Sequence, residues 1–196
     1  MKGGMNETRH ESNEARVTIK NDNPSVHLFT TSLQSPWGWV ALAGSEAGLR
    51  DLHLADTRSL GLSLLEEARM THTKSHVSPE ATVFSGYSAF DIVERLSAGQ
   101  DIEELTLDFR GTVFQIKVWQ GLRTIPSGST LSYQQFANSL GMPTATRAVA
   151  SACAKNRLAL LVPCHRIVRA DGGLGGYRWG IDRKRRILEI ESSNID

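Results

Sequence analysis

Residues 132–155 read SYQQFANSLGMPTATRAVASACAK, and their capping and turn residues specify the structure at the centre of the second half of the chain. Ser132 lies three residues before Gln135, which is the spacing of a capping box at the start of a helix. The pattern therefore predicts a short helix over Tyr133–Leu140. Gly141 favours the end of that helix because glycine readily adopts the left-handed conformation found after a helix C-terminus.

After the tight break at residues 141–143, the sequence predicts another helix over about Ala145–Lys155. Two short helices joined by a few residues that include Gly are typical of a helix-turn-helix unit. The second helix has small side chains where a major-groove reader usually carries Asn, Gln or Arg. These small residues are Ala148, Ala150, Ser151, Ala152 and Ala154, and Arg147 is the long cation near the start. Either this helix approaches DNA closely without reading much sequence, or it is an Ala-rich core helix.

Further elements of the second half follow from its capping and apolar patterns. Thr112 and Gln115 form another capping box, which predicts a helix that ends near Ile125. The apolar run at residues 160–162 is typical of a buried strand, and a last helix is expected to begin near Asp182.

The first half alternates short apolar runs with turn residues, as antiparallel strands do. We expect strands over 26–29, 38–43, 48–55 and 102–109 and helices over 57–70 and 85–98. Residues 1–24 are polar with few apolar anchors, so we expect a disordered lead-in. The chain is thus predicted to contain a small α/β unit over 25–109, with a supporting role, and a second unit over 110–196.

The 196 residues have a net charge of only +1, but the charge is unevenly distributed. Residues 1–109 carry 9 Lys and Arg against 16 Asp and Glu, whereas residues 110–191 carry 13 against 4. A basic half indicates a polyanionic partner, and nucleic acid is the first candidate because its phosphates release counterions when cations bind. A solvated basic face is the alternative.

The sequence also limits where the protein is expected to work. No apolar run approaches the roughly 18 to 20 residues of a membrane span, and the N-terminus lacks the apolar core of a secretory signal. The two cysteines, Cys153 and Cys164, are too few for a disulfide scaffold. We therefore expect a cytoplasmic protein without membrane contact, in which one cysteine matters for chemistry.

The candidate nucleophile lies in the run Pro163-Cys164-His165-Arg166. Proline stiffens the turn that presents the thiol, and neighbouring cations favour the thiolate. His165 can accept the thiol proton directly or through one water. Glu191, on the inward-facing side of the last helix, and Asn156 are candidates for orienting these groups. The alternatives are a cysteine that acts only as a small buried hydrophobe, a surface Glu and a helix-capping Asn.

Two other motifs carry weaker signals. Residues 172–176, GGLGG, lack the Lys-Ser/Thr of a phosphate-binding loop, so we interpret them as a hairpin or mobile loop. The cationic run 183–186 is most simply a solvated helical face. The cysteines and His165 do not have zinc-ligand spacing, so no metal is expected.

Several of these segments resemble one family, the O6-alkylguanine-DNA alkyltransferases, also called methylated-DNA–protein-cysteine methyltransferases. The resemblance covers about residues 110–191, and the motifs occur in the right order. They are Ser132-Tyr133-Gln134-Gln135, Arg147-Ala148-Val149, Asn156, Pro163-Cys164-His165-Arg166-Ile167-Val168, Gly176-Tyr177-Arg178-Trp179-Gly180 and Glu191. The resemblance implies a ribonuclease-H-like N-terminal α/β domain and a C-terminal winged-helix or helix-turn-helix domain.

The resemblance also implies a reaction and a role for each site residue. Cys164 would take an alkyl group irreversibly from O6 of guanine, or from O4 of thymine, with His165 and Glu191 generating the thiolate and Asn156 bracing the turn. Tyr133 would protonate the leaving guanine and help rotate the nucleotide out of the duplex. Arg147 would fill the vacated place in the base stack, with Ala148 and Ser151 facing the minor groove. Ile167, Arg178 and Trp179 would line the substrate pocket.

The resemblance implies no cofactor and no metal, and a monomer that binds double-stranded DNA largely independently of sequence. Two departures affect the shape of the pocket: Arg157 where many members have Pro, and Trp179 where some have Gly. Other classes remain as alternatives. They are a non-catalytic alkylation-damage-binding protein, which would lack the cysteine, a helix-turn-helix regulator, which would need base-reading side chains, and a cysteine hydrolase, which would turn over.

Overall fold

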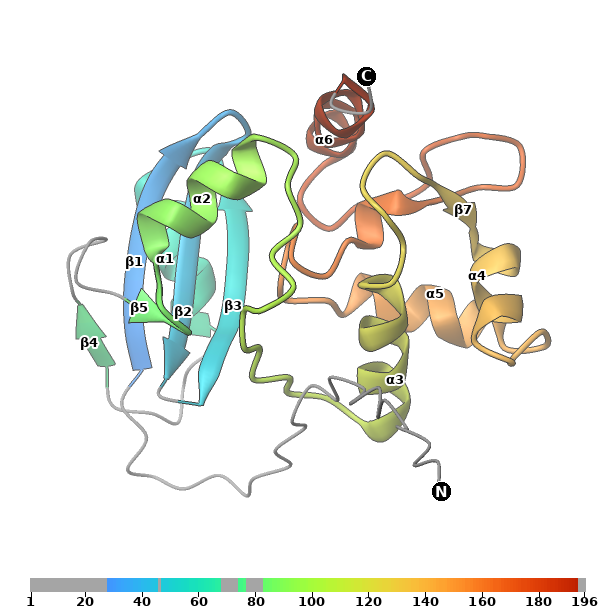
Figure 1. The fold of residues 1–196 in the computed structure, drawn as a ribbon, viewed down its shortest axis with the longest axis horizontal. Coiled ribbons are helices and arrows are strands. Elements are labelled where there is room, and N and C mark those ends of the chain that lie inside the picture. The colour runs from blue at the N-terminus through green and yellow to red at the C-terminus, as the bar shows by residue number, and fades with distance from the viewer. Residues whose placement is uncertain (1–27, 46, 68–73, 77–82, 194–196) are drawn as a thin grey trace, which may run out of the picture.

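The computed structural model describes residues 28–45, 47–67, 74–76 and 83–193. In Figure 1 the sheet and its flanking helices lie on the left, and the mainly helical second half lies on the right. The expected lead-in over 1–24 lies outside the described residues, as do residues 26–27 and 68–70 of two expected elements. No helix among the described residues is long and apolar enough to cross a membrane.

The first half is built on a four-stranded sheet in the order β3-β2-β1-β4. Strands β1 (Leu28–Ser35), β2 (Gly38–Ser45) and β3 (Gly48–Ala55) are antiparallel neighbours, and β4 (Lys74–His76) runs parallel to β1. The sequence pattern ended the first strand at Phe29, which was wrong. The strand continues because its next residues, Thr30 to Ser32, are polar but small and almost fully buried.

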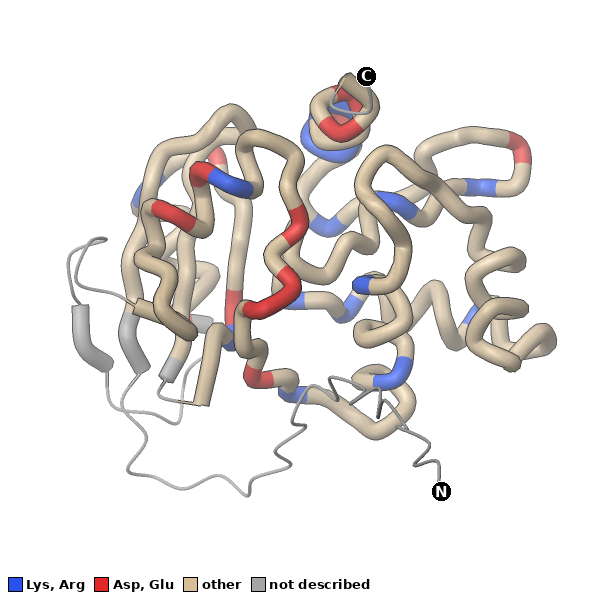
Figure 2. The backbone as a smooth tube through the Cα atoms, in the orientation of Figure 1, with Lys and Arg blue, Asp and Glu red and all other residues tan. Residues whose placement is uncertain are grey.

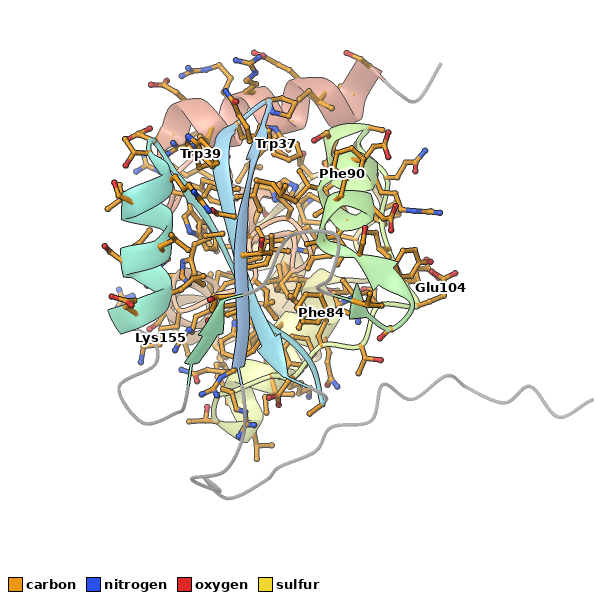
Figure 3. The ribbon with its side chains drawn as sticks, turned by 90° about the vertical axis from the view of Figure 1, so that its left-hand side faces the viewer. Trp37, Trp39, Phe84, Phe90, Glu104 and Lys155 are labelled. Carbon is orange, nitrogen blue, oxygen red and sulfur yellow. The ribbon has the colours of Figure 1, made fainter. Side chains whose placement is uncertain are left out.

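Helices α1 (Arg58–Glu67) and α2 (Ala89–Ser97) lie on opposite faces of this sheet (Figure 3). Side chains of β2 alternate between the two faces, as the pleat of a strand requires. Ala41 and Ala43 pack against Leu65 of α1, whereas Val40 and Leu42 belong to the main core.

The helix expected from Ser85 begins four residues later, after a short hairpin. Strands β5 (Val83–Phe84) and β6 (Tyr87–Ser88) pair across Ser85 and Gly86, which both have positive φ angles of 51° and 85°. Ser88 then caps α2 in a capping box with Asp91. The apolar pattern predicted the helix correctly but missed the turn in front of it.

All four helices that the sequence of the second half predicts are present, and the first three precede Cys164. These three are α3 (Val113–Leu122), α4 (Tyr133–Ser139) and α5 (Thr146–Ala154). Both expected capping boxes are confirmed, since each N-cap side chain and its Gln partner form the reciprocal pair of hydrogen bonds. The first of these helices ends at Leu122, three residues earlier than expected.

The active-site segment follows α5 and consists of short elements. Helix η1 (Cys164–Arg166) leads into β8 (Ile167–Val168), which pairs in parallel with β7 (Leu131–Ser132) just before α4. The chain then reaches α6 (Ile181–Ser193), the last helix. In the loop between them, the Arg169 N–H donates to the Gly173 carbonyl at 2.7 Å, so the Gly-rich segment folds back in a tight turn.

Two expected strands are absent from the described structure. Residues 160–162 form a turn, in which Leu160 has a φ angle of 67°, and all three side chains are buried. A three-residue apolar run therefore marked a buried turn and not a strand. Residues 102–109 form only one bridge, between Leu107 and Leu49 of β3, because Glu103 and Glu104 lie in a turn.

The two halves share main-chain hydrogen bonds and one hydrophobic core. The Leu52 N–H donates to the Arg157 carbonyl and the Ala159 N–H donates to the Leu52 carbonyl, both at 2.9 Å. The buried Asp51 carboxylate accepts from Arg157 Nε at 2.6 Å. Strand β3 thus pairs with the backbone that leads directly into the active-site turn.

Candidate active site

Cys164 begins η1 at the end of the buried turn and is only 8% exposed. Burial raises the pKa of its thiol, whereas the hydrogen bond from Asn156 and the charge of Lys184 lower this pKa. The other cysteine, Cys153 on α5, is also buried, and its burial raises the pKa to about 12. Lys184 also lowers the pKa of Cys153, so the hydrogen bond from Asn156 is what distinguishes Cys164, although burial makes both thiols unfavourable places for a charge.

Asn156 connects the end of α5 to the turn that carries Cys164. Its Nδ2 donates to Cys164 Sγ at 3.2 Å and to the Val162 carbonyl at 2.8 Å, and its Oδ1 accepts from the Leu158 N–H at 2.8 Å. The side chain is 1% exposed, so these contacts are protected from water. The structure thus brings the predicted Asn156 and Cys164 together, and the amide N–H is placed to stabilise a thiolate.

His165 and Glu191 form a buried pair. His165 Nε2 and Glu191 Oε1 are 2.9 Å apart, which joins η1 to α6. Burial alone would raise the pKa of Glu191, but hydrogen bonds from His165 and Arg166 lower it to about 2. Burial also lowers the pKa of His165, and Glu191 offsets this only in part.

This pairing determines which nitrogen of His165 can act as a base. Since the Glu191 carboxylate accepts a hydrogen bond, Nε2 of the neutral ring carries the proton, and Nδ1 is unprotonated. Nδ1 is buried and has no hydrogen-bond partner among the described residues. The ring of Tyr177 packs edge-on against His165, with the ring centres 6.3 Å apart.

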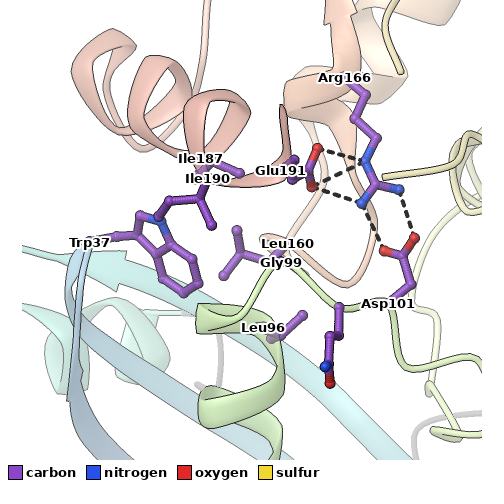
Figure 4. A pocket seen from close by; sticks show the side chains of 10 residues that line it. Trp37, Leu96, Gly99, Asp101, Leu160, Arg166, Ile187, Ile190 and Glu191 are labelled. Atoms are coloured by element: carbon purple, nitrogen blue, oxygen red, sulfur yellow. Dashed lines mark hydrogen bonds and ion pairs between the residues drawn. The ribbon is translucent and has the colours of Figure 1, made fainter. Parts of the chain in front are cut away.

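Arg166 holds Glu191 from the other side, a role that its place in the sequence did not predict. Its Nη2 donates to Glu191 Oε1 at 2.7 Å and to Asp101 Oδ1 at 2.8 Å, as Figure 4 shows. Arg166 is only 2% exposed. This role was not predicted because Asp101 and Glu191 are distant from Arg166 in the sequence. The only signal was that Arg166 is a cation close to Cys164.

The cationic run 183–186 is not a solvated face throughout, which corrects the expectation. Lys184 is fully buried, and its Nζ donates to the carbonyls of Ile167 and Leu174. Arg183 donates to the carbonyls of Trp37 and Trp179, and so ties α6 to the first half. Two of the four cations therefore stabilise the segments around the active site.

The residues expected to line a substrate pocket have different environments. Tyr133 begins α4 and is half-buried, and burial raises the pKa of its hydroxyl. Ile167 is fully buried, whereas Arg178 is exposed. Trp179 is 5% exposed, and its Nε1 donates to His53 Nδ1 of β3 at 3.4 Å. The indole therefore packs into the contact between the two halves.

The residues expected to face DNA share the outer side of α5. Arg147, Ala148 and Ser151 are exposed, while Val149 and Ala152 on the opposite side are buried. Of the two alternatives for this helix, a core helix and an exposed helix of small residues, each describes one face. One face packs into the core, and the other is exposed. Figure 2 shows Lys and Arg positions spread through the second half and acidic positions on the segment between α2 and α3.

Among the described residues, no group of three or more His, Cys, Asp or Glu side chains is arranged to hold a metal ion. The chemistry that the site offers is that of a hydrogen-bonded thiol beside a histidine base, which is suited to nucleophilic attack and proton transfer.

Comparisons with known proteins agree on one group of relatives. Residues 113–193 match the family described as "6-O-methylguanine DNA methyltransferase, DNA binding domain". The chain is 40% identical over 169 residues to the "Methylated-DNA--protein-cysteine methyltransferase" of Mycobacterium bovis, covering 86% of this chain and 93% of that protein. The crystal structure of "Mycobacterium tuberculosis OGT in complex with DNA" has a TM-score of 0.68 and 39% identity, covering 86% of this chain and 94% of that chain.

A longer relative is also similar. The chain is 44% identical over 157 residues to "Bifunctional transcriptional activator/DNA repair enzyme Ada" of Escherichia coli, covering 80% of this chain but 43% of that protein. It covers 52% of the "Regulatory protein ada" of Salmonella typhimurium. The chain therefore spans about half the length of these two relatives.

Proposed function

Because the chain belongs to the methylated-DNA–protein-cysteine methyltransferase family, we propose that it repairs DNA by moving a methyl group from O6 of guanine, or O4 of thymine, onto Cys164. The observation that carries the proposal is the contact between Cys164 Sγ and Asn156 Nδ2, next to a His165–Glu191 pair with an unprotonated Nδ1. A nucleophile, its hydrogen-bond donor, a base and a group that orients the base are thus close together.

The proposed reaction begins with the thiol proton, which passes to Nδ1 of His165 directly or through one water. Glu191 stabilises the imidazolium that forms, and Asn156 donates its N–H to the thiolate. The thiolate then attacks the alkyl carbon, the carbon–oxygen bond breaks, and its electron pair stays with the guanine. Tyr133 supplies a proton to the leaving base. The product is a thioether on Cys164, so each molecule reacts once.

The proposed DNA contact is the exposed face of α5. Its small side chains, Ala148 and Ser151, allow close approach in the minor groove without reading base edges, which makes binding largely independent of sequence. The alkylated atom faces the paired base, so the nucleotide must leave the stack before a thiolate can reach it. Arg147, exposed near the start of the helix, would fill the space left behind. We propose that the protein acts on duplex DNA as a monomer.

We further propose that Ile167, Arg178 and Trp179, with Tyr133, line the pocket that receives the base. The proposal is supported by the position of Ile167, which follows η1 directly and whose neighbour Val168 pairs with Ser132, just before the start of α4. Arg178 and Trp179 belong to the loop whose Tyr177 packs on His165.

Two finer features of the architecture also belong to this proposal. The mixed α/β fold resembles the solved methyltransferase structures. We propose that residues 25–109 form a ribonuclease-H-like domain and residues 110–196 a winged-helix DNA-binding and alkyl-acceptor domain. The sheet with α1 and α2, and the helices α3 to α5, support this division.

Intact-protein mass spectrometry after incubation with duplex DNA that contains O6-methylguanine tests the function. We expect a gain of about one CH₂ unit on Cys164 that stops after one equivalent, because a thioether is a poor leaving group. Cys164→Ala should gain no mass but still bind DNA, and Cys153→Ala should react as the unmodified chain does. Binding without any mass gain would identify a damage-binding protein instead, and catalytic turnover or a methyl group on Cys153 would also refute the proposal.

A further inference from the structure

Asp101 belongs to the acidic first half of the chain but reaches the buried active-site network. It lies on the segment between α2 and α3, and its carboxylate accepts from Arg166 Nη1 at 3.2 Å and Nη2 at 2.8 Å. The same guanidinium donates from Nε and Nη2 to Glu191. Figure 4 shows Arg166 between the two carboxylates, one from each half of the protein.

The geometry fixes Arg166 and, through it, Glu191. A planar guanidinium can make paired contacts with a carboxylate along each of its edges, and here both edges are used. Nη1 of Arg166 also donates to the Ile125 carbonyl. Since Glu191 is 4% exposed, its orientation toward His165 depends on these protein contacts and not on water.

Charge balance gives Asp101 a second effect. The charged or titratable groups around His165 are Glu191 and Lys184 from α6, Arg166 and Cys164 from η1, and Tyr177 from the following loop. Lys184 and Arg166 are buried cations that disfavour a proton on His165, and Glu191 offsets only one of them. With Asp101 included, two carboxylates face two cations before the thiol proton moves.

We propose that Asp101 is a positioning residue for the alkyl transfer, which holds Arg166 and balances its charge so that Glu191 can stabilise the imidazolium of His165. This inference rests on the proposed function of Cys164. It gives the acidic half a direct part in the chemistry beyond structural support.

Asp101→Asn tests the inference, since asparagine keeps an acceptor for Arg166 but removes the charge. The rate at which iodoacetamide alkylates Cys164, located by mass spectrometry, should be measured from pH 6 to pH 10. The contacts through Arg166 and Glu191 place Asp101 within about 8 Å of His165, so we expect a decrease on the order of tenfold near pH 7. The difference should close at alkaline pH, where the thiolate forms without help from His165.

Glu103→Gln is the matched control, because it removes one exposed acid from the same segment and Glu103 has no side-chain contact with Arg166. Its profile should match that of the unmodified chain. An Asp101→Asn profile that is unchanged, or lowered by one factor at every pH, would overturn the inference. Methyl transfer from DNA is measured in parallel: if the unmodified chain transfers nothing while the alkylation profile still shifts, the proposed function fails and the role of Asp101 remains.

Discussion

Replacing Asn156 by Ala should lower both the stability of the fold and the rate of transfer, because one buried amide contributes to each. Its Oδ1 accepts from the Leu158 N–H, and its Nδ2 donates to the carbonyls of Val162 and Leu158 and to Cys164 Sγ. The contacts with the backbone stabilise the fold, and the contact with Sγ stabilises the thiolate. The Ala variant loses both at once. The neighbouring hydrogen bonds determine how much each loss costs.

The cost to stability follows from which buried groups lose their only partner. The Val162 carbonyl still accepts from the Cys164 N–H at 2.7 Å, and the Leu158 carbonyl still accepts from the Val162 N–H at 2.9 Å. Only the Leu158 N–H is left without an acceptor, so we expect the free energy of unfolding to fall by about 1 to 3 kcal/mol. The lost hydrogen bond to a thiolate is worth about 1.5 to 3 kcal/mol, which should slow methyl transfer roughly ten- to hundredfold.

Urea unfolding and single-turnover transfer from methylated duplex DNA measure the two effects. Asn156→Asp is the informative companion, because it keeps the acceptor for Leu158 but presents a carboxylate oxygen to Cys164 and to the Val162 carbonyl. At neutral pH it should transfer more slowly than the Ala variant, since its charge opposes the thiolate. The reasoning is refuted if Asn156→Asp reacts faster than Asn156→Ala, or if the Ala variant keeps the full rate.

Three further predictions concern DNA, pH and pocket size. Arg147→Ala should slow reaction with duplex DNA much more than reaction with the free alkylated base, and equal losses would remove Arg147 from the flipping step. The pKa of Glu191 is about 2 in the folded state against 4.5 in the unfolded state, so its ionised form adds on the order of 3 kcal/mol to the free energy of unfolding above pH 4.5. This contribution should be lost as the pH falls toward 2. In urea unfolding, Glu191→Gln should lack this acid sensitivity. Trp179→Gly should lower stability by about 3 kcal/mol and raise the rate with O6-benzylguanine relative to methylated DNA, whereas an unchanged ratio would assign the indole to packing alone.

Local signals predicted the helices of the second half well. A capping box specifies a helix start through contacts within four residues, so Thr112 and Ser132 were sufficient to locate α3 and α4. The expected strand over 48–55 coincides with β3 because apolar side chains alternate between turn residues. Signals of this kind do not depend on the rest of the fold.

Features that depend on distant contacts were not predictable in the same way. Residues 160–162 would be apolar both in a strand and in a buried turn, so their composition does not distinguish the two. The turn depends on contacts with distant residues, since Val162 accepts from Asn156 and the neighbouring Ala159 donates to Leu52 of β3. Lys184 was expected on a solvated helical face, and the partners of Arg166 were not predicted, because the groups that both cations contact come from other elements. The pairing of His165 with Glu191 was expected, but the Asp101 contact behind it had no sequence signal.

The hydrogen bonds between Leu52 and residues 157 and 159 limit how this protein could be divided for engineering. The natural place to cut, judged from the charge reversal near residue 110, would leave the part of β3 around Leu52 as an open strand edge, which is a template for aggregation. The excised basic part would lose the backbone partner of the segment that carries its reactive thiol into place. The acidic half should therefore be kept together with the basic half in any engineered version, and it should not be exchanged for another domain.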